Sequence, residues 1–511
     1  MNIPYCLRRT RHLNADRIAT LHGESKVTYR EFAAEVDRSA RKFVTLGAKK
    51  GDRVAVLMLN CPEYLNFYFS IPLCGAAIMP LNTRWHRNEV TFTLIDSGAT
   101  ILLLDEKHAP ILSEIREALP WVRHFVYVGD GNCPSDLEDW RKIPPADVAE
   151  FEEPHEDDMA GLFYTSGTTG GPKGAMLSHR NIWSNTVHAL LSPNALSDDA
   201  VYLHAAPMFH LADASAIVGL TLLGATHCFL ATFDPEAVLQ LIHKYRVTHI
   251  VLVPAMLNMV VNHPNFDRYD TSSLRRITYG ASPMPIPLLQ LSMRKFKAEF
   301  GQGYGMTELS PVATILGWAD HKLENLDQEF TPIKSAGRAV IGAEVKVVDD
   351  LDRDLPPGQI GEIVCRGPNV MLGYWNRPEI NAEVLRGGWM HTGDLGVFDE
   401  NGFLYIRDRK KDMIKSGGEN IYSPEVESVI AGHPAVLEAA VIGVPHPKWD
   451  EAVRAILVLR PGASLTEAAL IEWCRERLTH FKCPSSVVFM KELPKGGTGK
   501  VQKSVLRASA S

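Results

Sequence analysis

A run of glycine and hydroxyl-bearing residues between Tyr164 and Gly174 is the most chemically specific feature of the sequence. Glycine lets backbone N–H groups approach an anion closely, and serine or threonine adds short hydrogen-bond donors. A lysine near the end of the run adds a positive charge suited to phosphate. The spacing differs from the GxxxxGK[ST] pattern of the Walker A loop. We therefore predict a phosphate-binding loop of another kind, with these candidate residues: Thr165, Ser166, Gly167, Thr168, Thr169 and Lys173.

Four further motifs follow this run along the chain. They are GQGYGMTE (301–308), HTGDLG (391–396), DRKKDMIKSGGENIYSPEVE (408–427) and LPKGGTGKVQK (493–503). Together with TSGTTGGPKGAMLSH, they resemble the ordered motifs of the adenylate-forming (AMP-binding) enzyme superfamily. This superfamily includes acyl-CoA synthetases, adenylation domains and beetle luciferases. The resemblance spans nearly the whole chain and is nearest to the fatty and medium-chain acyl-CoA synthetases.

The resemblance implies a nucleotide site built from the first four motifs. Residues 165–173 would hold the β- and γ-phosphates of ATP, and Thr307 would contact the α-phosphate. Glu308 would ligate Mg²⁺, which prefers carboxylate and phosphate oxygens. Asp394 would accept hydrogen bonds from the ribose, with Arg409 nearby. Tyr304 would stack on adenine, beside these further nucleotide-binding positions: Gly280, Ala281, Ser282, Gln302 and Gly303.

The same resemblance places the catalytic lysine and a hinge in the last hundred residues. Lys500 would bridge the attacking carboxylate and the α-phosphate, and so stabilise the transition-state charge. Lys411 matches the hinge on which the family's small domain swings, a position where many members carry Asp. Lys415 and Gly418 would meet the active site in the second state, where Gly418 could let pantetheine pass.

A pocket for the acid is implied beside the nucleotide site. His210, in PMFHLAD, would gate the entry of pantetheine, although a lone histidine in an apolar segment is commonly a core residue. Amino-acid adenylation domains carry an Asp early in this segment, so His210 disfavours an amino acid while the nearby Asp213 leaves that possibility open. Acetate enzymes carry Trp where Gly305 stands. The expected lining is apolar: Phe209, Leu230, Ala255, Tyr279, Gly305 and Met306.

The resemblance therefore predicts an acid–thiol ligase that uses ATP, CoA and Mg²⁺ on a hydrophobic, fatty or related, carboxylic acid. The alternatives are an aryl or modified short-chain acid as substrate, or a carrier-protein thiol as acceptor. A luciferase-type oxygenase shares these motifs. A nucleotide-binding regulator would be expected to lose Glu308 or Lys500, and both are present. The sequence contains no GxSxG nucleophile elbow, which argues against an α/β-hydrolase thioesterase.

Elements that could position these residues follow from the pattern of the chain. Thr28 and Glu31 form a capping box that opens a helix ending near Gly47. Short apolar runs alternate with helical stretches up to about residue 281, which is typical of βαβ units and of sheets covered on both faces. The runs are RVAVLML, AAIMPL, ATILLLD, VYLHAAP, THCFLAT, THIVLVP and RRITYGA.

The pattern changes beyond residue 337. Short strands with an Asn401-Gly402 hairpin signal predict a small antiparallel module. A capped helix, two strands and a further helix then predict a compact α+β domain. The fold class is therefore α/β: two α/β subdomains and a small β-barrel module, followed by a mobile α+β domain. The expected domains are 1–410, the adenylate-forming part, and 411–511, which carries the catalytic lysine.

Composition excludes several other classes of protein. The chain has 511 residues, of which 45% are hydrophobic and 22% charged, with a net charge of −7, so nothing favours a nucleic-acid partner. Its eight cysteines contain no CxxC pair, which suits a reducing compartment. No apolar segment of a secretory signal follows the basic start. Uncharged residues 214–233 predict a buried helix and strand separated by Gly224, rather than a membrane span. A cytoplasmic protein is expected, and a homodimer is left as an open alternative to a monomer.

Overall fold

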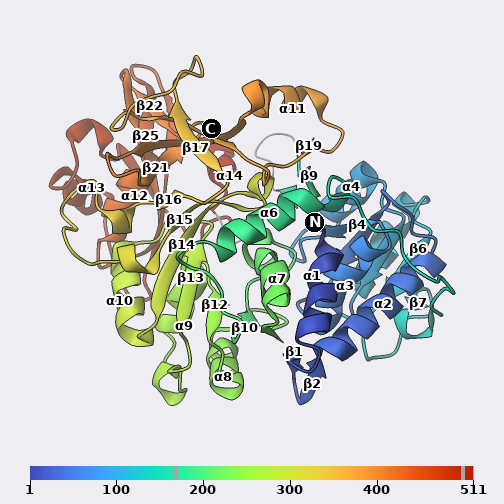
Figure 1. The fold of residues 1–511 in the computed structure, drawn as a ribbon. Helices are drawn as coiled ribbons and strands as arrows, with labels where there is room; N and C mark the ends of the chain where they lie inside the picture. Colours follow the sequence, from blue (N-terminus) through green and yellow to red (C-terminus); the bar gives the residue numbers. More distant parts are fainter. Residues whose placement is uncertain (166–170, 496–500, 510–511) are drawn as a thin grey trace.

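The computed structural model describes residues 1–165, 171–495 and 501–509. These residues form two large sheets, a small antiparallel sheet and a C-terminal α+β domain (Figure 1). The first large sheet, on the right of Figure 1, has this strand order: β19 (Gly373–Tyr374), β9 (Lys173–Ser178), β8 (Met159–Thr165), β4 (Ala77–Pro80), β3 (Arg53–Leu57), β5 (Ile101–Leu104), β6 (His124–Tyr127) and β7 (Glu138–Asp139).

Helices cover both faces of this sheet because its strands are apolar on both sides. On β3, Val54 and Val56 belong to one buried cluster, with residues of α2 and α3. The alternate residues Ala55 and Leu57 belong to another, with residues of α4 and α5. This alternation follows the two-residue repeat of a strand. The covering helices are α2 (Tyr29–Thr45), α3 (Pro62–Leu73), α4 (Arg87–Ser97) and α5 (Leu112–Ile115).

The second large sheet repeats this arrangement at the lower left of Figure 1. Its order is β16 (Arg338–Ala339), β15 (Val312–Leu316), β14 (Glu299–Gly305), β13 (Arg276–Gly280), β12 (His249–Val251), β10 (Val201–His204), β11 (Thr226–Phe229), β1 (Ile18–His22) and β2 (Ser25–Thr28). The helices on its faces are α7 (Leu211–Leu223), α8 (Pro235–Tyr245), α9 (Pro254–Val261) and α10 (Ile286–Phe296).

Helices α1 (Ile3–Leu13) and α6 (His179–Leu190) pack with α3 and α7 where the two halves meet. The sequence did not predict α1, although its cap is readable, since the Asn2 side chain accepts the N–H of Tyr5 and Pro4 stands in the first turn. The antiparallel pairs β1–β2, β8–β9 and β14–β15 were also missed. The sheets are therefore mixed, with parallel cores and antiparallel margins.

The capping box at Thr28 and Glu31 is confirmed, since each side chain accepts the other's backbone N–H and α2 ends one residue before Leu46. Gly224 ends α7 at φ +75°, in the left-handed conformation, and β11 follows. The uncharged stretch is thus a buried helix and strand, as predicted. Among the described residues, we find no helix with the length and apolar character that crossing a membrane would require.

The expected β module is the antiparallel sheet β17 (Glu344–Val348), β18 (Gly361–Arg366), β20 (Met390–Phe398) and β21 (Leu404–Arg409), with α11 (Pro378–Val384) inserted before β20. The C-terminal domain is coloured orange to red in Figure 1. It comprises β22 (Ile414–Ser416), β23 (Glu419–Ile421), α12 (Ser423–Ala431), β24 (Val436–His446), β25 (Asp450–Leu459), α13 (Glu467–Arg475), β26 (Ser486–Phe489) and α14 (Lys503–Ala508).

Candidate active site

The two ends of the glycine-rich run lie side by side. Thr165 ends β8 and Lys173 begins β9, and the two residues are partners in the antiparallel register. The Thr165 hydroxyl donates to the Lys173 carbonyl oxygen at 3.4 Å. Ser166, Gly167, Thr168 and Thr169 lie outside the described residues. The sheet thus brings the first hydroxyl and the lysine of the predicted phosphate loop together, at the carboxyl end of β8.

Glu308 and Lys173 lie on either side of a residue that the sequence did not single out, Tyr374 of β19. The Tyr374 hydroxyl donates to Oε1 of Glu308 at 2.5 Å. The Lys173 ammonium lies 5.6 Å from the centroid of the same ring. Burial, and then the negative charge of Glu308, raise the pKa of Tyr374, so the hydroxyl keeps its proton and acts as the donor. The motif GYWNRPE was the available signal in the sequence.

Glu308 is 4% exposed and lies in a short 3₁₀ turn, Thr307–Leu309, that follows β14. Within the ranges that the structure describes, no lysine or arginine forms an ion pair with its carboxylate. Thr307 is half-buried beside it. A buried carboxylate whose recorded partner among the described residues is a hydroxyl is suited to a hard cation, because the burial of a charge normally requires a compensating partner.

Tyr304, Asp394 and Arg409, three residues expected at the nucleotide site, lie in contact with one another. The Tyr304 hydroxyl donates to Oδ2 of Asp394 at 2.9 Å. Nε of Arg409 lies 3.2 Å from Oδ1 of the same carboxylate. Burial, and then the charge of Asp394, raise the pKa of Tyr304 well above its usual value. This contact joins β14 of the second large sheet to β20 and β21 of the small antiparallel sheet.

The predicted adenine wall lies where β13 ends. A Cβ at Gly280 would stand 2.4 Å from the carbonyl oxygen of Gly303 on the neighbouring strand, so only glycine fits there. Ala281 has φ +65°, an uncommon conformation for a residue with a side chain. Ser282 is half-buried next to it, as is Gln302 on β14. A strained turn at the carboxyl end of a parallel strand is a common place for ligand contact.

Of the residues expected around the acid pocket, His210 and Tyr279 have side-chain hydrogen bonds that fix their rings. His210 caps the N-terminus of α7, where its Nδ1 accepts the N–H of Ala212 at 3.0 Å. Tyr279 is 1% exposed, and its hydroxyl lies 3.1 Å from Nε2 of His321. Phe209 is buried, whereas Leu230, Gly305 and Met306 are half-buried and Ala255 is exposed at the start of α9.

Gly305 has a steric role as well as a predicted position in the pocket. A Cβ built on it would lie 1.9 Å from the carbonyl oxygen of Pro311. Met306 donates its N–H to that same carbonyl at 2.9 Å, which holds the two segments together. The close backbone approach therefore excludes any side chain at position 305 in this conformation. The absence of a bulky residue there has a structural reason besides an open pocket.

Behind the segment that carries Phe209 and His210 lies a buried polar chain that the sequence did not reveal. Asp213 accepts hydrogen bonds from His204 Nδ1 at 2.6 Å and from the Tyr202 hydroxyl at 3.1 Å. His204 Nε2 lies 3.0 Å from Nδ1 of His227, whose Nε2 lies 3.2 Å from the Thr221 hydroxyl. All five side chains are buried. Both carboxylate oxygens of Asp213 thus accept hydrogen bonds from buried groups.

Three of the predicted C-terminal residues, Lys411, Lys415 and Gly418, lie within the described part of the chain, and Lys500 does not. Lys411 lies in the turn between β21 and β22, where a hinge was expected. Lys415 and Gly418 are exposed on the β22–β23 hairpin, and the Lys415 N–H donates to Oε2 of Glu451. No described contact joins either of them to Glu308 or Asp394. Lys500 lies outside the described residues, but its flanks Lys495 and Val501 form an antiparallel bridge.

Lys503, three residues after Lys500, joins the C-terminal helix to the start of the small domain. Its ammonium lies 2.7 Å from Oε1 of Glu427 and donates to the Ser423 hydroxyl at 2.6 Å. Ser423 in turn donates its N–H and hydroxyl to Asp408 of β21, at 2.7 and 2.8 Å. Burial raises the pKa of both Asp408 and Glu427. The residues after the predicted catalytic lysine are therefore held against the end of the N-terminal part.

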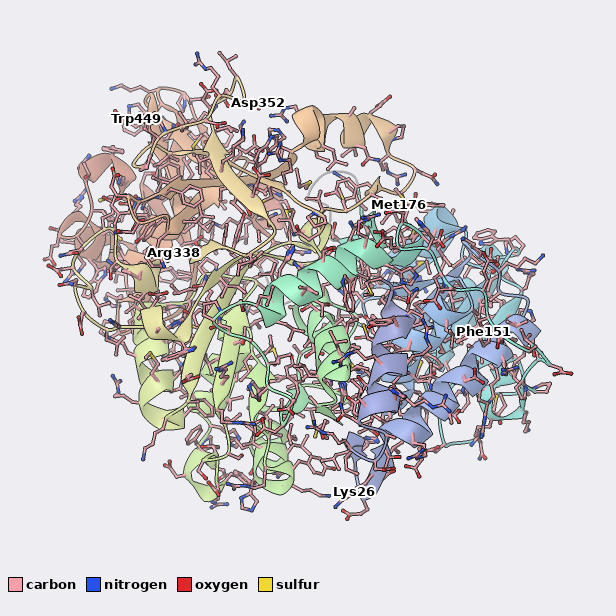
Figure 2. The ribbon with its side chains drawn as sticks, viewed as in Figure 1. Lys26, Phe151, Met176, Arg338, Asp352 and Trp449 are labelled. Carbon is pink, nitrogen blue, oxygen red and sulfur yellow. The ribbon has the colours of Figure 1, made fainter. Side chains whose placement is uncertain are left out.

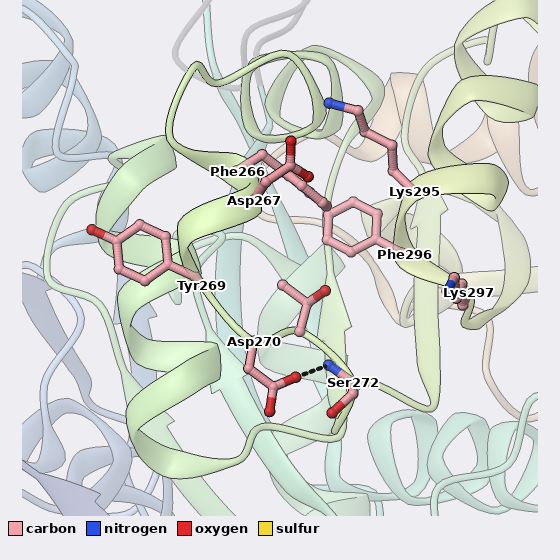
Figure 3. Close-up of a pocket in the computed structure, with 9 residues that line it drawn as sticks. Phe266, Asp267, Tyr269, Asp270, Ser272, Lys295, Phe296 and Lys297 are labelled. Atoms are coloured by element: carbon pink, nitrogen blue, oxygen red, sulfur yellow. Dashed lines mark hydrogen bonds between the residues drawn. The ribbon is translucent and has the colours of Figure 1, made fainter.

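A surface hollow of about 480 Å³ lies elsewhere (Figure 3). It is lined by Phe266, Asp267, Tyr269, Asp270, Thr271, Ser272, Lys295, Phe296 and Lys297. Ser272 comes shortly before β13 begins, whereas Gly280 ends that strand. Ligands of open α/β sheets bind beyond the carboxyl ends of the strands. This hollow therefore does not belong to the candidate site. Nowhere in the described ranges do three or more His, Cys, Asp or Glu side chains gather as a metal site.

Comparison with known families accounts for these features together. Residues 7–375 match the AMP-binding enzyme family, and residues 425–500 match the AMP-binding enzyme C-terminal domain. The chain belongs to the AMP-binding enzyme family. Its large N-terminal part and small C-terminal domain are those of adenylate-forming enzymes, as the sequence motifs predicted.

Individual relatives are named acid–CoA ligases. The chain is 39% identical over 506 residues to a feruloyl-CoA synthase from an Amycolatopsis species, covering 98% of this chain and 97% of the relative. It is 36% identical to a long-chain-fatty-acid–CoA ligase, FadD13, from Mycobacterium tuberculosis, covering 95% and 93%. Among solved structures, an o-succinylbenzoate-CoA synthetase from Bacillus subtilis with its acyl-adenylate superposes with a TM-score of 0.86, at 33% identity over 98% and 97% of the two chains.

Proposed function

We propose that this protein is an ATP-dependent acid–CoA ligase that activates a hydrophobic carboxylic acid. In the first step, the acid's carboxylate attacks the α-phosphorus of ATP, forming acyl-AMP and releasing pyrophosphate. In the second, the thiol of CoA attacks the acyl carbonyl, and AMP leaves. The observations that support this most are two groups of contacts, Tyr304–Asp394–Arg409 and Glu308–Tyr374–Lys173, in which every residue except Tyr374 lies on a family motif.

Both steps require anions to be positioned and developing negative charge to be neutralised. Lys173, together with the run from Thr165 to Thr169, would hold the β- and γ-phosphates. Thr307 would contact the α-phosphate. Asp394 would accept the ribose hydroxyls, and the Tyr304 ring would stack on adenine against Gly280–Ser282. Lys500 would neutralise charge between the carboxylate and the α-phosphate during adenylation.

Glu308 is the residue we propose as the ligand of Mg²⁺. Its carboxylate is buried, and it has an oxygen that Tyr374 does not use. Bound there, the ion would offset the negative charge of the ATP phosphates. The comparison structures include an o-succinylbenzoate-CoA synthetase with ATP and a magnesium ion. This supports the chemistry for the family, and the assignment to Glu308 rests on the residues described above.

The second step would use His210, Lys415 and Gly418. Because Nδ1 of His210 accepts the Ala212 N–H, the ring as placed carries its proton on Nε2 when neutral. We propose that this ring gates the entry of pantetheine. Lys411, in the turn between β21 and β22, would be the hinge for the movement of residues 411–511, which would carry Lys415 and Gly418 towards the site.

The nature of the acid is constrained by Asp213. Its side chain has no exposed surface and both of its oxygens accept hydrogen bonds from buried groups, so we do not expect it to hold the amine of an amino acid. The remaining expected lining, with Phe209, Tyr279 and Met306, is largely apolar. We therefore propose a fatty or related hydrophobic acid. An aryl acid is the second candidate, favoured by the similarity to a feruloyl-CoA synthase.

Pyrophosphate and AMP release measured across fatty, arylpropenoic and amino acids, with and without CoA, test this proposal. We expect turnover that requires both a hydrophobic acid and CoA. A preference for ferulate-type acids over fatty acids would select the second candidate. Adenylation without any transfer to CoA would point to another acceptor, such as a carrier protein. The absence of acid-dependent pyrophosphate release would contradict the proposed function.

A further inference from the structure

Strand β19, the two residues Gly373 and Tyr374, joins the phosphate-loop strand to the segment that carries Glu308. It pairs antiparallel with β9, near Met176, which Figure 2 labels. On one side, Leu372 N–H donates to the Met176 carbonyl at 2.9 Å, and Trp375 N–H donates to the Gly174 carbonyl at 2.8 Å. The strand is thus bonded along the first residues after Lys173.

The other contacts of this segment fix Tyr374 itself. Asn381 of α11 accepts the Tyr374 N–H at 2.7 Å and donates to its carbonyl at 2.9 Å, so both backbone groups are satisfied by one side chain. Just before the strand, Met371 N–H donates to the backbone carbonyl of Glu308 at 2.9 Å. The backbone that carries the Tyr374 ring is therefore hydrogen-bonded to β9 on one side and to Asn381 on the other. The backbone of Glu308 is hydrogen-bonded to the same segment.

The Tyr374 side chain contacts both charged groups of the proposed phosphate and metal site. Its hydroxyl donates to Oε1 of Glu308, and its ring lies against the Lys173 ammonium. A lysine and a glutamate so placed around one ring would attract each other strongly in a buried setting. The ring offers the ammonium a cation–π contact, and the hydroxyl offers the carboxylate a hydrogen bond. Each charge thus has a partner other than the opposite charge.

We propose that Tyr374 is a positioning residue that holds the Glu308 carboxylate in the orientation for metal binding and keeps Lys173 from pairing with it. The inference rests on the proposed function, in which Glu308 serves the metal and Lys173 the phosphates. Tyr374 uses one carboxylate oxygen and leaves the other. Its removal would let Glu308 turn, and would leave a buried carboxylate without its donor.

The test uses Tyr374→Phe in the full-length protein, with Mn²⁺ as a spectroscopic probe for the metal. Mn²⁺ is titrated with protein and ATP by electron paramagnetic resonance, without any acid, so no turnover occurs. We expect the apparent affinity for Mn²⁺ to weaken by about ten-fold, the range associated with losing a hydrogen bond to a charged group. ATP binding without metal should change little, because the ring remains beside Lys173. Unchanged or tighter Mn²⁺ binding would overturn the proposal.

Two further variants separate this role from general damage. Tyr405→Phe removes another buried tyrosine hydroxyl, which donates to Asp399 at 3.2 Å in the β module, and should leave Mn²⁺ affinity unchanged. Combining Tyr374→Phe with Glu308→Gln tests the route of the effect. If Tyr374 acts through Glu308, Tyr374→Phe adds little to the loss that Glu308→Gln causes alone. Full additivity of the two losses would contradict the proposed route.

The same data distinguish failure of this inference from failure of the proposed function. If Glu308→Gln weakens Mn²⁺ binding and Tyr374→Phe does not, the metal assignment stands and the positioning role is wrong. If Glu308→Gln has no effect on Mn²⁺ binding, the metal assignment itself is wrong, and the role of Tyr374 falls with it. Thermal unfolding of each variant identifies any that fails to fold. In that case Asn381→Asp provides a milder disturbance of Tyr374, because aspartate keeps the acceptor for the Tyr374 N–H but loses the donor to its carbonyl. This variant should also weaken Mn²⁺ binding.

Discussion

The imidazole of His204 and the carboxylate of Asp213 form a pair 2.6 Å apart, and neither side chain has any exposed surface. Asp213 lies in the first turn of α7, and His204 ends β10. The pair thus joins the helix that His210 caps to the strand that precedes the Phe209–His210 segment. A buried charge is tolerated only where its partners are well placed, so the geometry of this segment depends on a pair remote from solvent.

We expect Asp213→Asn to destabilise the protein by about 3 kcal/mol, because an amide has one acceptor oxygen and cannot serve both His204 Nδ1 and the Tyr202 hydroxyl as the carboxylate does. Urea denaturation at neutral pH measures the loss. The matched control is Asp199→Asn, which removes an exposed carboxylate 3.0 Å from Arg275 and should cost less than about 1 kcal/mol. Equal losses in the two variants would show that the buried pair contributes no more to the free energy of unfolding than the exposed pair does.

Buried neutral histidines predict a loss of stability in mild acid. Burial lowers the pKa of both His179 and His249 to about 4. The unfolded chain binds a proton at each site below about pH 6.5, whereas the folded chain does so only below about pH 4. Stability is therefore retained above pH 6.5 and falls as the pH drops through this window, by about 2 kcal/mol per histidine at pH 5.

Urea denaturation at pH 7 and pH 5 checks this slope. His249→Gln supplies the control, since a side chain that does not titrate removes one of these protons. The variant should lose less stability than the parent between the two pH values, by about 2 kcal/mol. An identical pH dependence in the two proteins would show that His249 titrates alike in both states, contrary to the effect of its burial.

The parts of the fold that the sequence predicted rest on local signals. The capping box of Thr28 and Glu31, the end of α7 at Gly224 and the hairpin at Asn401 are each set by a few neighbouring residues. Tyr304, Asp394 and Arg409 were proposed as nucleotide-binding residues because each lies within a recognisable family motif, and the structure brings the three together.

What the sequence did not reveal depends on contacts between distant segments. Tyr374 meets Glu308 across 66 positions, and Lys503 meets Ser423 across 80. His204 and Asp213 are only nine residues apart. Even so, nothing in the sequence indicates that β10 and α7 bring the two side chains together in a fully buried position. Pairings of this kind are decided by tertiary packing, which neither helical nor strand periodicity encodes.

Lys503 is expected to hold the C-terminal helix on the small domain. We predict that Lys503→Met destabilises that domain by about 2 kcal/mol, because Glu427 and Asp408 then lose the cation nearest to them. The loss should shrink as the pH falls, since protonation of Glu427 removes the unpaired charge. The control is Lys482→Met, from a more exposed pair with Glu425, expected to cost under about 1 kcal/mol. Equal losses at every pH would contradict this explanation.

Lys500 carries the sharpest functional prediction, made from its motif alone. Lys500→Ala should lose acyl-adenylate formation, because charge between the carboxylate and the α-phosphate is no longer neutralised in the transition state. The loss should be at least about a hundred-fold. Transfer from supplied acyl-AMP to CoA should persist, since that step does not use the lysine. Acid-dependent exchange of pyrophosphate into ATP measures the first step, and thioester formation from acyl-AMP measures the second.

The matched control is Lys495→Ala, which removes a side chain that pairs with Glu438 at 2.6 Å. This variant should leave both steps intact. Normal exchange in Lys500→Ala, or parallel loss of both steps, would remove Lys500 from the adenylation chemistry.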